Sequence, residues 1–295
     1  MRPARIYVLR SPNSAVLSRD VGESYLVSKL MGVIIAVLGD THGNWREAFA
    51  LVVAACSATG VPASELAAIF QVGDAEPLRS EAEAAQVCGP AKYRKLGDFA
   101  DVVTGELVAP APVYFIAGNH EPFGALDADG GLVEGSGSWG PNVTYLGRAG
   151  SASIGGLRIG FLSGIFGPTV FRLSEAGELG RRRGKKAAHY TAQEHQTVRS
   201  AIAGGVDVLL THDWPTGVGE VSRFGAPGDQ RVRDMIEDYR PILSLHGHMH
   251  RPASAVIGNT QVACLAIVGY RSGDPMAAVG LWNIDTETRH ATRLA

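Results

Sequence analysis

Histidine, aspartate and asparagine residues gather in a few short motifs of this sequence. Five of the nine histidines lie there, with two aspartates and one asparagine. The residues are Asp40, His42, Asp74, Asn119, His120, His212, His248 and His250. Carboxylate, imidazole and amide ligands suit Mn²⁺, Fe²⁺, Zn²⁺ or Co²⁺, and the lack of cysteine in these motifs argues against copper(I) and iron–sulfur chemistry. The residue types therefore predict a divalent-metal site.

Two pairs within these motifs have the same spacing. Asp40 and His42 are two positions apart, as are His248 and His250, so in an extended turn both members of a pair can face one ion. A single pair of this kind occurs by chance in many loops, but the motifs together are a strong signal. His246 precedes the second pair, and we expect it to pack or hydrogen-bond at a strand end rather than bind metal.

Each motif directly follows a short apolar segment that predicts a buried strand. These strands cover residues 31–38, 68–72, 113–117, 208–211 and 242–245. In parallel α/β sheets, ligands gather beyond the carboxyl ends of strands. The pattern therefore predicts that the motifs lie at the ends of sheet strands.

The rest of the chain predicts helices and a second sheet. We expect helices over residues 45–56, 63–68, 91–105, 191–203 and 229–239, and strands over 143–146, 152–154, 157–162, 261–268 and 277–284. Gly155-Gly156 predicts a two-residue hairpin turn. Because no repeat or linker is apparent, we predict one domain over residues 31–295. For residues 1–30 we weigh a disordered tail, an upstream start codon with Met31 as the initiator and, last, a functional extension.

Composition excludes several classes of protein. The chain has 295 residues, 45% of them hydrophobic, which is enough for a sizeable core. A formal charge of −2 excludes a protein that binds nucleic acid over a wholly basic surface, but it allows a local basic patch. Three cysteines without a CxxC pair argue against a disulfide framework and indicate a reducing cytoplasm. No apolar run approaches the ~20 residues of a membrane span. We therefore expect a protein of the cytoplasm that is not embedded in a membrane.

The motifs together resemble those of the calcineurin-like metallophosphoesterases, over roughly residues 33–252. In chain order they are Asp40-x-His42, Gly73-Asp74, Gly118-Asn119-His120-Glu121, His212 and Gly247-His248-x-His250. The resemblance implies an α/β fold, a four-layer αββα sandwich of two mixed β-sheets flanked by helices. It also implies two divalent metal ions (Mn²⁺, Fe²⁺ or Zn²⁺) at the strand ends.

The resemblance also assigns the ligands. It implies a first ion bound by Asp40, His42, Asp74 and His250, and a second bound by Asp74, Asn119, His212 and His248. Asp74 would bridge the two ions, and His120 would act as an acid rather than a ligand. Such a pair of ions clamps the phosphate, lowers the pKa of a bridging water and supports in-line attack by hydroxide on phosphorus.

Further segments resemble the catalytic domain of RNA lariat debranching enzymes, which cut 2′,5′-phosphodiesters. They lie at residues 73–82, 90–95, 141–147, 158–166 and 211–215. Those enzymes generally carry cysteine at the first ligand position, where this chain has Asp40. The resemblance implies a phosphate-ester substrate such as branched RNA, another nucleic acid or a nucleotide. It also places the basic run Arg181, Arg182, Arg183, Lys185 and Lys186 in a substrate-recognition loop, for which a solvated surface loop is the alternative.

We predict a metal-dependent phosphodiesterase, with two alternatives. A phosphomonoesterase such as a protein phosphatase would use the same chemistry, but the residues after Asp74 lack the Asp-Arg-Gly of protein phosphatases. A non-catalytic binding module on the same scaffold is disfavoured because every expected ligand is present.

Overall fold

The first of two mixed β-sheets has seven strands in the order β13-β12-β1-β2-β3-β5-β4. Their bounds are β1 Val33–Leu38, β2 Ala68–Gln71, β3 Val113–Phe115, β4 Ser138–Gly140, β5 Val143–Tyr145, β12 Val279–Asp285 and β13 His290–Arg293. Strands β1, β2, β3 and β5 run parallel, and β12 pairs antiparallel with β1. The parallel strands β1 and β2 are almost wholly buried, as expected of a sheet covered on both faces.

The second sheet has six strands in the order β10-β11-β9-β8-β7-β6. Their bounds are β6 Ala149–Ile154, β7 Leu157–Leu162, β8 Val208–Thr211, β9 Leu243–His246, β10 Ala253–Ile257 and β11 Thr260–Cys264. Strands β7, β8 and β9 are parallel, and β6 and β7 form the predicted hairpin. Its turn residues Gly155 and Gly156 have φ of 57° and 85°, values that glycine adopts at little cost.

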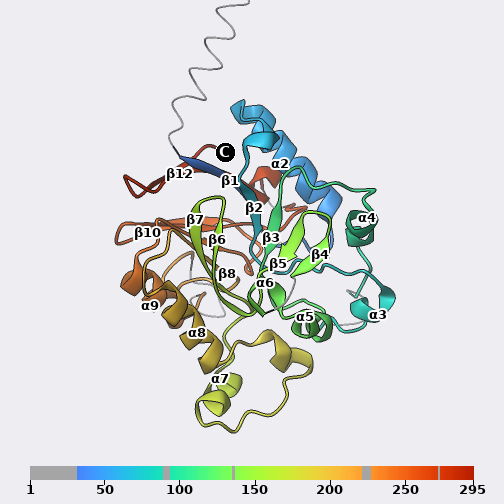
Figure 1. Ribbon diagram of the computed structural model, residues 1–295, viewed down its shortest axis with the longest axis vertical. Helices are drawn as coiled ribbons and strands as arrows, with labels where there is room; N and C mark the ends of the chain where they lie inside the picture. The colour runs from blue at the N-terminus through green and yellow to red at the C-terminus, as the bar shows by residue number, and fades with distance from the viewer. Residues whose placement is uncertain (1–31, 89–93, 135–136, 221–226, 272) are drawn as a thin grey trace, which may run out of the picture. The chain divides into compact units, whose positions relative to one another are not determined.

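Helices cover the outer faces of the two sheets (Figure 1). The α-helices are α2 Trp45–Thr59, α3 Glu81–Ala84, α4 Phe99–Thr104, α5 Phe123–Asp129, α6 Gly131–Glu134, α7 Pro168–Glu175, α8 Ala192–Ile202 and α9 Gln230–Tyr239. The 3₁₀-helices are η1 Ala63–Glu65, η3 Gly184–Ala188 and η4 Pro275–Ala278. Helix α2 packs on β1 and β12, and α8 packs on β6 and β7. The order helix–sheet–sheet–helix is the predicted four-layer sandwich, which confirms the fold class.

The main hydrophobic core lies between the sheets. It joins Val37 and Phe70 of the first sheet to Phe161, Leu210 and Leu245 of the second, and all five side chains are fully buried. A second core joins the outer face of the second sheet to α8 and α9. These two hydrophobic cores pack against opposite faces of β8 and β9 and hold the ends of these strands in fixed positions.

This computed structural model describes residues 32–88, 94–134, 137–220, 227–271 and 273–295. Residues 33–295 form one compact unit. The predicted N-terminal extension, residues 1–30, lies outside the described residues, and the proposed domain boundary stays a prediction. None of the helices in the described ranges has the length and apolar character needed to cross a bilayer.

The predicted strands that precede the motifs are all present, with ends shifted by a few residues. The helix predicted over 63–68 was wrong: only Ala63–Glu65 form a short 3₁₀-helix, because Ala68 already pairs with β1 at the start of β2. Of the helix predicted over 91–105, the described part is helical only at Phe99–Thr104, and residues 89–93 lie outside the description. The strands β4, β10 and β13 and the helices α3 and α5–α7 were missed.

The ion pair between Asp207 and Arg158, at the start of β8, is predicted to stabilise the fold. The buried Asp207 carboxylate accepts hydrogen bonds from the Arg158 backbone N (2.8 Å) and guanidinium (3.0 Å). Burial by itself raises the pKa of Asp207, but these hydrogen bonds from Arg158 lower it below its ordinary value. Asp207→Asn should therefore lower the free energy of unfolding by about 1–3 kcal/mol at neutral pH, measured by urea titration.

The same ion pair fixes the pH dependence of that loss. A lowered carboxyl pKa stabilises the fold above the unfolded-state pKa of about 3.9, and this contribution disappears as the pH falls through the folded-state value. The difference between wild type and Asp207→Asn should therefore shrink in acid. A difference that stays constant from neutral pH into acid would show that charge plays no part.

Candidate metal centre

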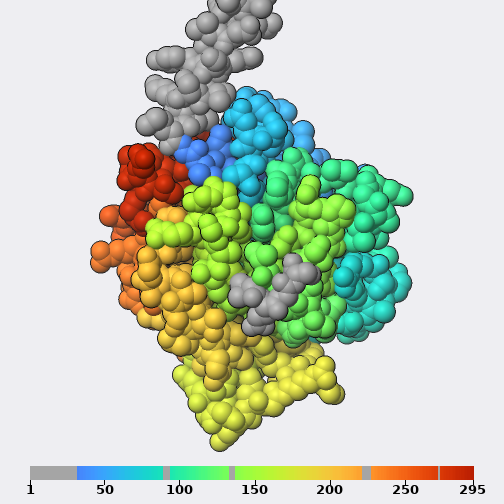
Figure 2. Space-filling model, in the orientation of Figure 1, coloured from blue at the N-terminus to red at the C-terminus, as the bar shows by residue number. Residues whose placement is uncertain are grey.

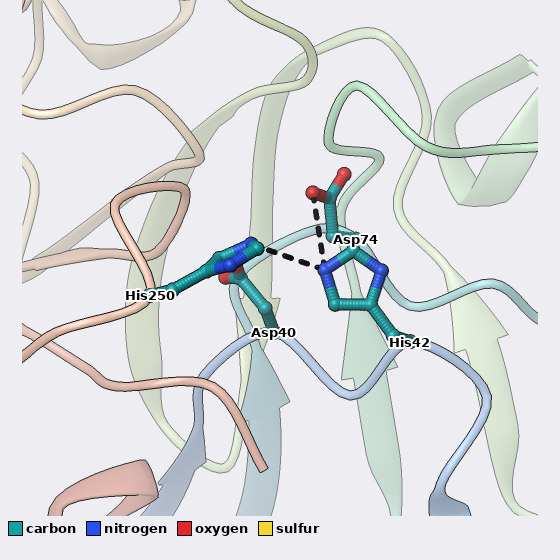
Figure 3. Close-up of side chains that lie close together, drawn as sticks. All are labelled: Asp40, His42, Asp74 and His250. Carbon is teal, nitrogen blue, oxygen red and sulfur yellow. Dashed lines mark hydrogen bonds and ion pairs between the residues drawn. The ribbon is translucent and has the colours of Figure 1, made fainter. Parts of the chain in front are cut away.

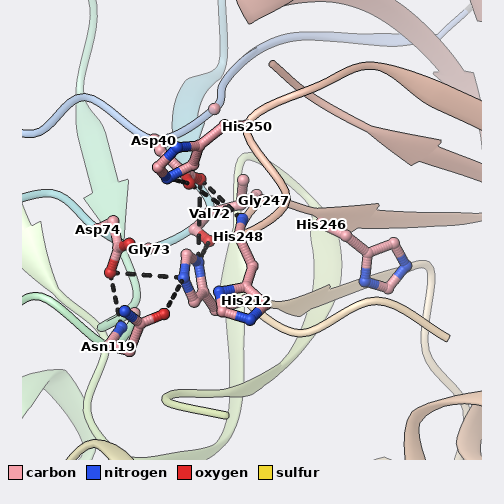
Figure 4. Close-up of polar contacts among 12 residues, drawn as sticks. Asp40, Val72, Gly73, Asp74, Asn119, His212, His246, Gly247, His248 and His250 are labelled. Carbon is pink, nitrogen blue, oxygen red and sulfur yellow. Dashed lines mark hydrogen bonds and ion pairs between the residues drawn. The ribbon is translucent and has the colours of Figure 1, made fainter. Parts of the chain in front are cut away.

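The loops that follow β1, β2, β3, β8 and β9 carry the predicted metal ligands, and they converge at one place (Figure 4). Strands β1, β2 and β3 are parallel neighbours in one sheet, and β8 and β9 are parallel neighbours in the other. Their carboxyl ends therefore deliver all five loops to the same region. Asp40, Asp74 and His212 are completely buried.

Four predicted ligands form a tight cluster (Figure 3). One ligand atom each from Asp40, His42, Asp74 and His250 lies within 4.8 Å of the others. His250 Nε2 is 3.1 Å from Asp40 Oδ2 and 3.1 Å from His42 Nε2. His42 Nε2 is 3.6 Å from Asp74 Oδ2. This is the set that the family resemblance implies for the first metal ion.

The second predicted set lies on the other side of Asp74. His212 Nε2 is 3.4 Å from Asp74 Oδ1 and 3.3 Å from Asn119 Oδ1. His212 Nδ1 donates to Val72 O at 2.8 Å, which makes Nε2 the nitrogen that can bind a metal ion. The His248 ring lies 5.0 Å from the His212 ring, centroid to centroid. All seven predicted ligand residues thus surround one region.

Asp74 occupies the centre of this region. Its Oδ1 accepts hydrogen bonds from the backbone N of Asn119 (2.6 Å) and His120 (2.7 Å). Its Oδ2 is buried, and within the described part of the chain it has no hydrogen-bond partner. A buried carboxylate oxygen without a partner is costly, and a bound cation would satisfy it. The residues present therefore fit a divalent metal ion.

The pKa values of the site also indicate a place for a cation. Burial would lower the pKa of His212, but the charge and hydrogen bond of Asp74 raise it to about 10. Burial would likewise lower the pKa of His42, but Glu76 and Asp74 raise it to about 9. Burial would raise the pKa of Asp74, but the charge of His212 holds it well below its usual range. The carboxylates thus create a region that favours positive charge, which a metal ion supplies.

Four ligand residues have backbone conformations that non-glycine residues rarely adopt. The φ angles are 44° at His42, 52° at Asp74, 71° at His248 and 56° at His250. Such conformations cost on the order of 1–3 kcal/mol each and concentrate at functional sites. Glycine is required at Gly118 for a different reason, because a Cβ atom there would overlap the side chains of Asp74 and His212.

The two remaining motif histidines have different surroundings. The His120 ring is partly exposed and lies 5.4 Å from the His42 ring, centroid to centroid. His246 points away from the cluster (Figure 4) and hydrogen-bonds Thr211 Oγ1 at 2.8 Å and Ser244 Oγ at 2.9 Å. Burial lowers the pKa of His246 to about 3. The expected hydrogen-bonding role of His246 is therefore confirmed.

Comparison with known families identifies the chain. The sequence profile described as calcineurin-like phosphoesterase matches residues 34–252, which include every predicted ligand. The chain belongs to the calcineurin-like phosphoesterase family. This family comprises phosphoric ester hydrolases that use divalent metals, and the cluster of Asp40, His42, Asp74 and His250 is a possible metal-binding site in this member.

Curated relatives of this phosphoesterase are lariat debranching enzymes. That of Schizosaccharomyces pombe is 26% identical over 63% of this chain and 43% of its own length. That of Caenorhabditis briggsae is 29% identical over 84% of this chain and 51% of its own length. The chain thus spans about half the length of these relatives. One solved structure aligns with 90% of this chain and all of its own at a TM-score of 0.50 and 14% identity, a likeness of fold alone.

Two hollows in the phosphoesterase lie beside the predicted ligands and the basic run. A pocket of about 640 Å³ is lined by Asn119, His120, Gly184 and Lys185 among others. A second hollow of about 700 Å³ is lined by residues 181–183 and shares Gly184 with the first. Figure 2 shows the chain between β7 and α8, in yellow, at the lower end of the described surface. The fold thus brings the basic run beside the candidate site.

Within the basic run, Arg182 differs from its neighbours. Its guanidinium pairs with both oxygens of Glu194, at 2.5 and 2.9 Å, and donates to His189 O at 2.7 Å. Arg181, Arg183, Lys185 and Lys186 are exposed. Arg182 therefore anchors the loop to α8, while its four neighbours in the run face solvent.

Sequence analysis missed Glu121 as a structural residue of the site. This fully buried carboxylate accepts hydrogen bonds from the backbone N of Ala75 (2.8 Å), Glu76 (3.0 Å) and Gly118 (3.1 Å). Burial and the nearby charge of Asp74 raise its pKa to about 8. Glu121 thereby ties the loop after β2 to the loop after β3. Its place directly after His120 in the Gly-Asn-His-Glu motif was the available signal.

Proposed function

We propose that this chain is a metal-dependent phosphodiesterase that binds two divalent ions and acts on a nucleic acid or nucleotide. The observation that carries the proposal is the position of Asp74, whose Oδ2 lies 3.6 Å from His42 Nε2 and whose Oδ1 lies 3.4 Å from His212 Nε2. One carboxylate thus faces a ligand group on each side. The candidate ions are Mn²⁺, Fe²⁺ and Zn²⁺.

The ligand assignment that we propose is the one predicted from the sequence. One ion would be held by Asp40, His42, Asp74 and His250, and the other by Asp74, Asn119, His212 and His248. When bound, such ions polarise the phosphoryl group and make water a stronger nucleophile near neutral pH. The chain's own groups orient the ligands: His248 N donates to Asp40 Oδ1 at 2.9 Å, and Val72 O fixes the His212 ring.

His120 is the proposed general acid. Its backbone N is bound to Asp74 Oδ1, and its side chain lines the pocket of about 640 Å³. It therefore lies beside the ligands without belonging to the four-residue cluster. An alkoxide leaving oxygen needs a proton as the ester bond breaks, and imidazole can supply one near neutral pH.

We propose 2′,5′-branched RNA as the first substrate to test. The curated relatives are named lariat debranching enzymes, and the hollow beside His120 and its neighbour are lined by the exposed cations Arg181, Arg183 and Lys185. A polyanion longer than one phosphate would contact both regions. The experiment is a substrate panel with Mn²⁺, Fe²⁺ and Zn²⁺, containing branched RNA, linear RNA, a chromogenic phosphodiester and its monoester. Hydrolysis of the monoester alone would contradict the proposal in favour of a phosphomonoesterase.

Neutralising the exposed part of the basic loop should weaken binding of a polyanion. The variant carries Arg181→Gln, Arg183→Gln, Lys185→Gln and Lys186→Gln, and keeps Arg182 because that residue anchors the loop. We expect KM for an RNA substrate to rise about tenfold or more at low salt and its salt dependence to flatten, by ~0.7 in log–log slope for each lost phosphate contact. The small chromogenic diester should be hydrolysed at the wild-type rate.

A second variant controls for the change in net charge. It neutralises Arg46, Arg199, Arg233 and Arg289, which lie in α2, α8 and α9 and after β12. This control should leave KM for RNA within about twofold of wild type. Equal losses in the two variants would mean that net charge, rather than this loop, governs binding.

A further inference from the structure

Glu76 contacts a predicted metal ligand from the opposite side to the metal cluster. Its Oε1 lies 2.8 Å from His42 Nδ1, while His42 Nε2 faces Asp74 and His250. The Glu76 side chain is 8% exposed, so water competes little for this hydrogen bond. The residues are 34 positions apart in the sequence, and the contact exists only because the loops after β1 and β2 lie side by side.

The backbone holds Glu76 in this position from two directions. Its N–H donates to Glu121 Oε2 at 3.0 Å, and its carbonyl accepts from Leu78 N at 2.8 Å. Its φ is 43°, a conformation that non-glycine residues keep only where their surroundings enforce it. The loop after β1 is fixed to the same segment, since Thr41 Oγ1 donates to Ala75 O at 2.9 Å. The contact is therefore built into the fold rather than formed by a mobile surface side chain.

We propose that Glu76 is a positioning residue for His42, holding its ring so that Nε2 faces the metal bound by Asp40, His42, Asp74 and His250. This inference rests on the proposed two-metal function and adds a residue to it. A carboxylate can only accept hydrogen bonds, so His42 Nδ1 keeps its proton toward Glu76, and Nε2 is the nitrogen that would give its lone pair to a bound metal ion. Glu76 also adds negative charge behind the imidazole, which strengthens it as a ligand. Outer partners of this kind typically change metal affinity by about 10–100-fold.

The inference predicts an effect on one of the two metal sites only. His212, in the other predicted set, is oriented by the Val72 carbonyl instead. Titration of metal-free protein with Mn²⁺ in a calorimeter should therefore show one binding phase weakened about 10–100-fold in Glu76→Ala and the other within about twofold of wild type. Glu76→Gln retains an acceptor oxygen of the same reach, so its loss should be smaller than that of Glu76→Ala.

Three further measurements separate positioning from other roles. Glu47→Gln removes the same charge from the first turn of α2, five residues after His42, and should leave both phases unchanged. Nitrogen-15 NMR of the histidine rings in Zn²⁺-loaded protein should show His42 with its proton on Nδ1 in wild type and in Glu76→Gln, and a mixture of ring forms in Glu76→Ala. Circular dichroism should show that both Glu76 variants are folded.

The inference is overturned if Mn²⁺ binds wild type and Glu76→Ala equally, if wild type binds no metal, or if the His42 ring form is the same in all variants. Failure of the proposed function is a separate result. A wild-type protein that binds Mn²⁺ but hydrolyses no phosphodiester would refute the phosphodiesterase, while the comparison of Glu76 variants would still decide the role of Glu76.

Discussion

Asp74→Ala should reduce hydrolysis to the background rate and remove metal from both proposed sites. One carboxylate faces His42 on one side and His212 on the other, so its loss deprives two ions of a ligand at once. We expect a fall in kcat of about 10³-fold or more, equivalent to about 4 kcal/mol of transition-state stabilisation. Steady-state kinetics and elemental analysis of the purified variant measure the two effects.

A matched variant separates metal binding from loop structure. Asp74 Oδ1 also accepts the N–H groups of Asn119 and His120, so alanine leaves two backbone donors without a partner. Asp74→Asn keeps an acceptor oxygen in place but removes the negative charge. We expect Asp74→Asn to keep a wild-type circular dichroism spectrum and still to lose metal and activity. Two equivalents of metal in either variant would overturn the bridging role.

His120→Ala should keep both metals and lose most of its rate on an ester with a poor leaving group. The side chain lies outside the four-residue cluster, and the backbone N–H that binds Asp74 remains in the variant. General acid catalysis is typically worth ~10²–10⁴ in rate. We therefore expect a loss of that size on an alkyl or ribose diester, with KM within a few fold of wild type.

The leaving group provides the test of this role. A nitrophenolate leaves without a proton, so His120→Ala should lose much less rate on a nitrophenyl ester than on the alkyl ester. His290→Ala, an exposed histidine at the start of β13, should leave both rates unchanged. Equal losses on the two esters, or loss of metal with the histidine, would show that His120 is a ligand or a structural residue.

Much of the fold could be predicted from the sequence because local patterns of hydrophobic residues indicate it. Strand β1 is a run of six apolar residues, and its neighbour β2 is buried along its whole length and apolar up to Gln71, so a short apolar run marks both. The missed strands lack that signal. Strand β10 contains Ala253, Ser254 and Ala255, residues of low strand preference, and β13 is the polar sequence His290–Arg293. Both are edge strands that form only because a neighbouring strand offers its hydrogen bonds.

The candidate ligands could also be predicted from local sequence patterns. Pairs such as Asp40 and His42 lie in one loop, directly after a strand that fixes its direction, so their spacing alone predicts that they face one ion. The rule that parallel strands end at a common edge accounts for the loops of each sheet separately, those after β1, β2 and β3 in one and those after β8 and β9 in the other. The packing of the two sheets against each other brings the two sets together. The convergence is now visible in the structure, while the assignment of individual ligands to ions stays a prediction.

The sequence by itself determined the family, the strands that precede the motifs and the residue types at the candidate metal centre. Tertiary structure decided which outer residues support them. Glu76 reaches His42 across 34 positions, and Arg182, one cation in a run of five, pairs with Glu194 while its neighbours stay exposed. No local pattern distinguishes these residues, because a hydrogen bond between distant segments depends on how the chain packs and not on the residues next to it.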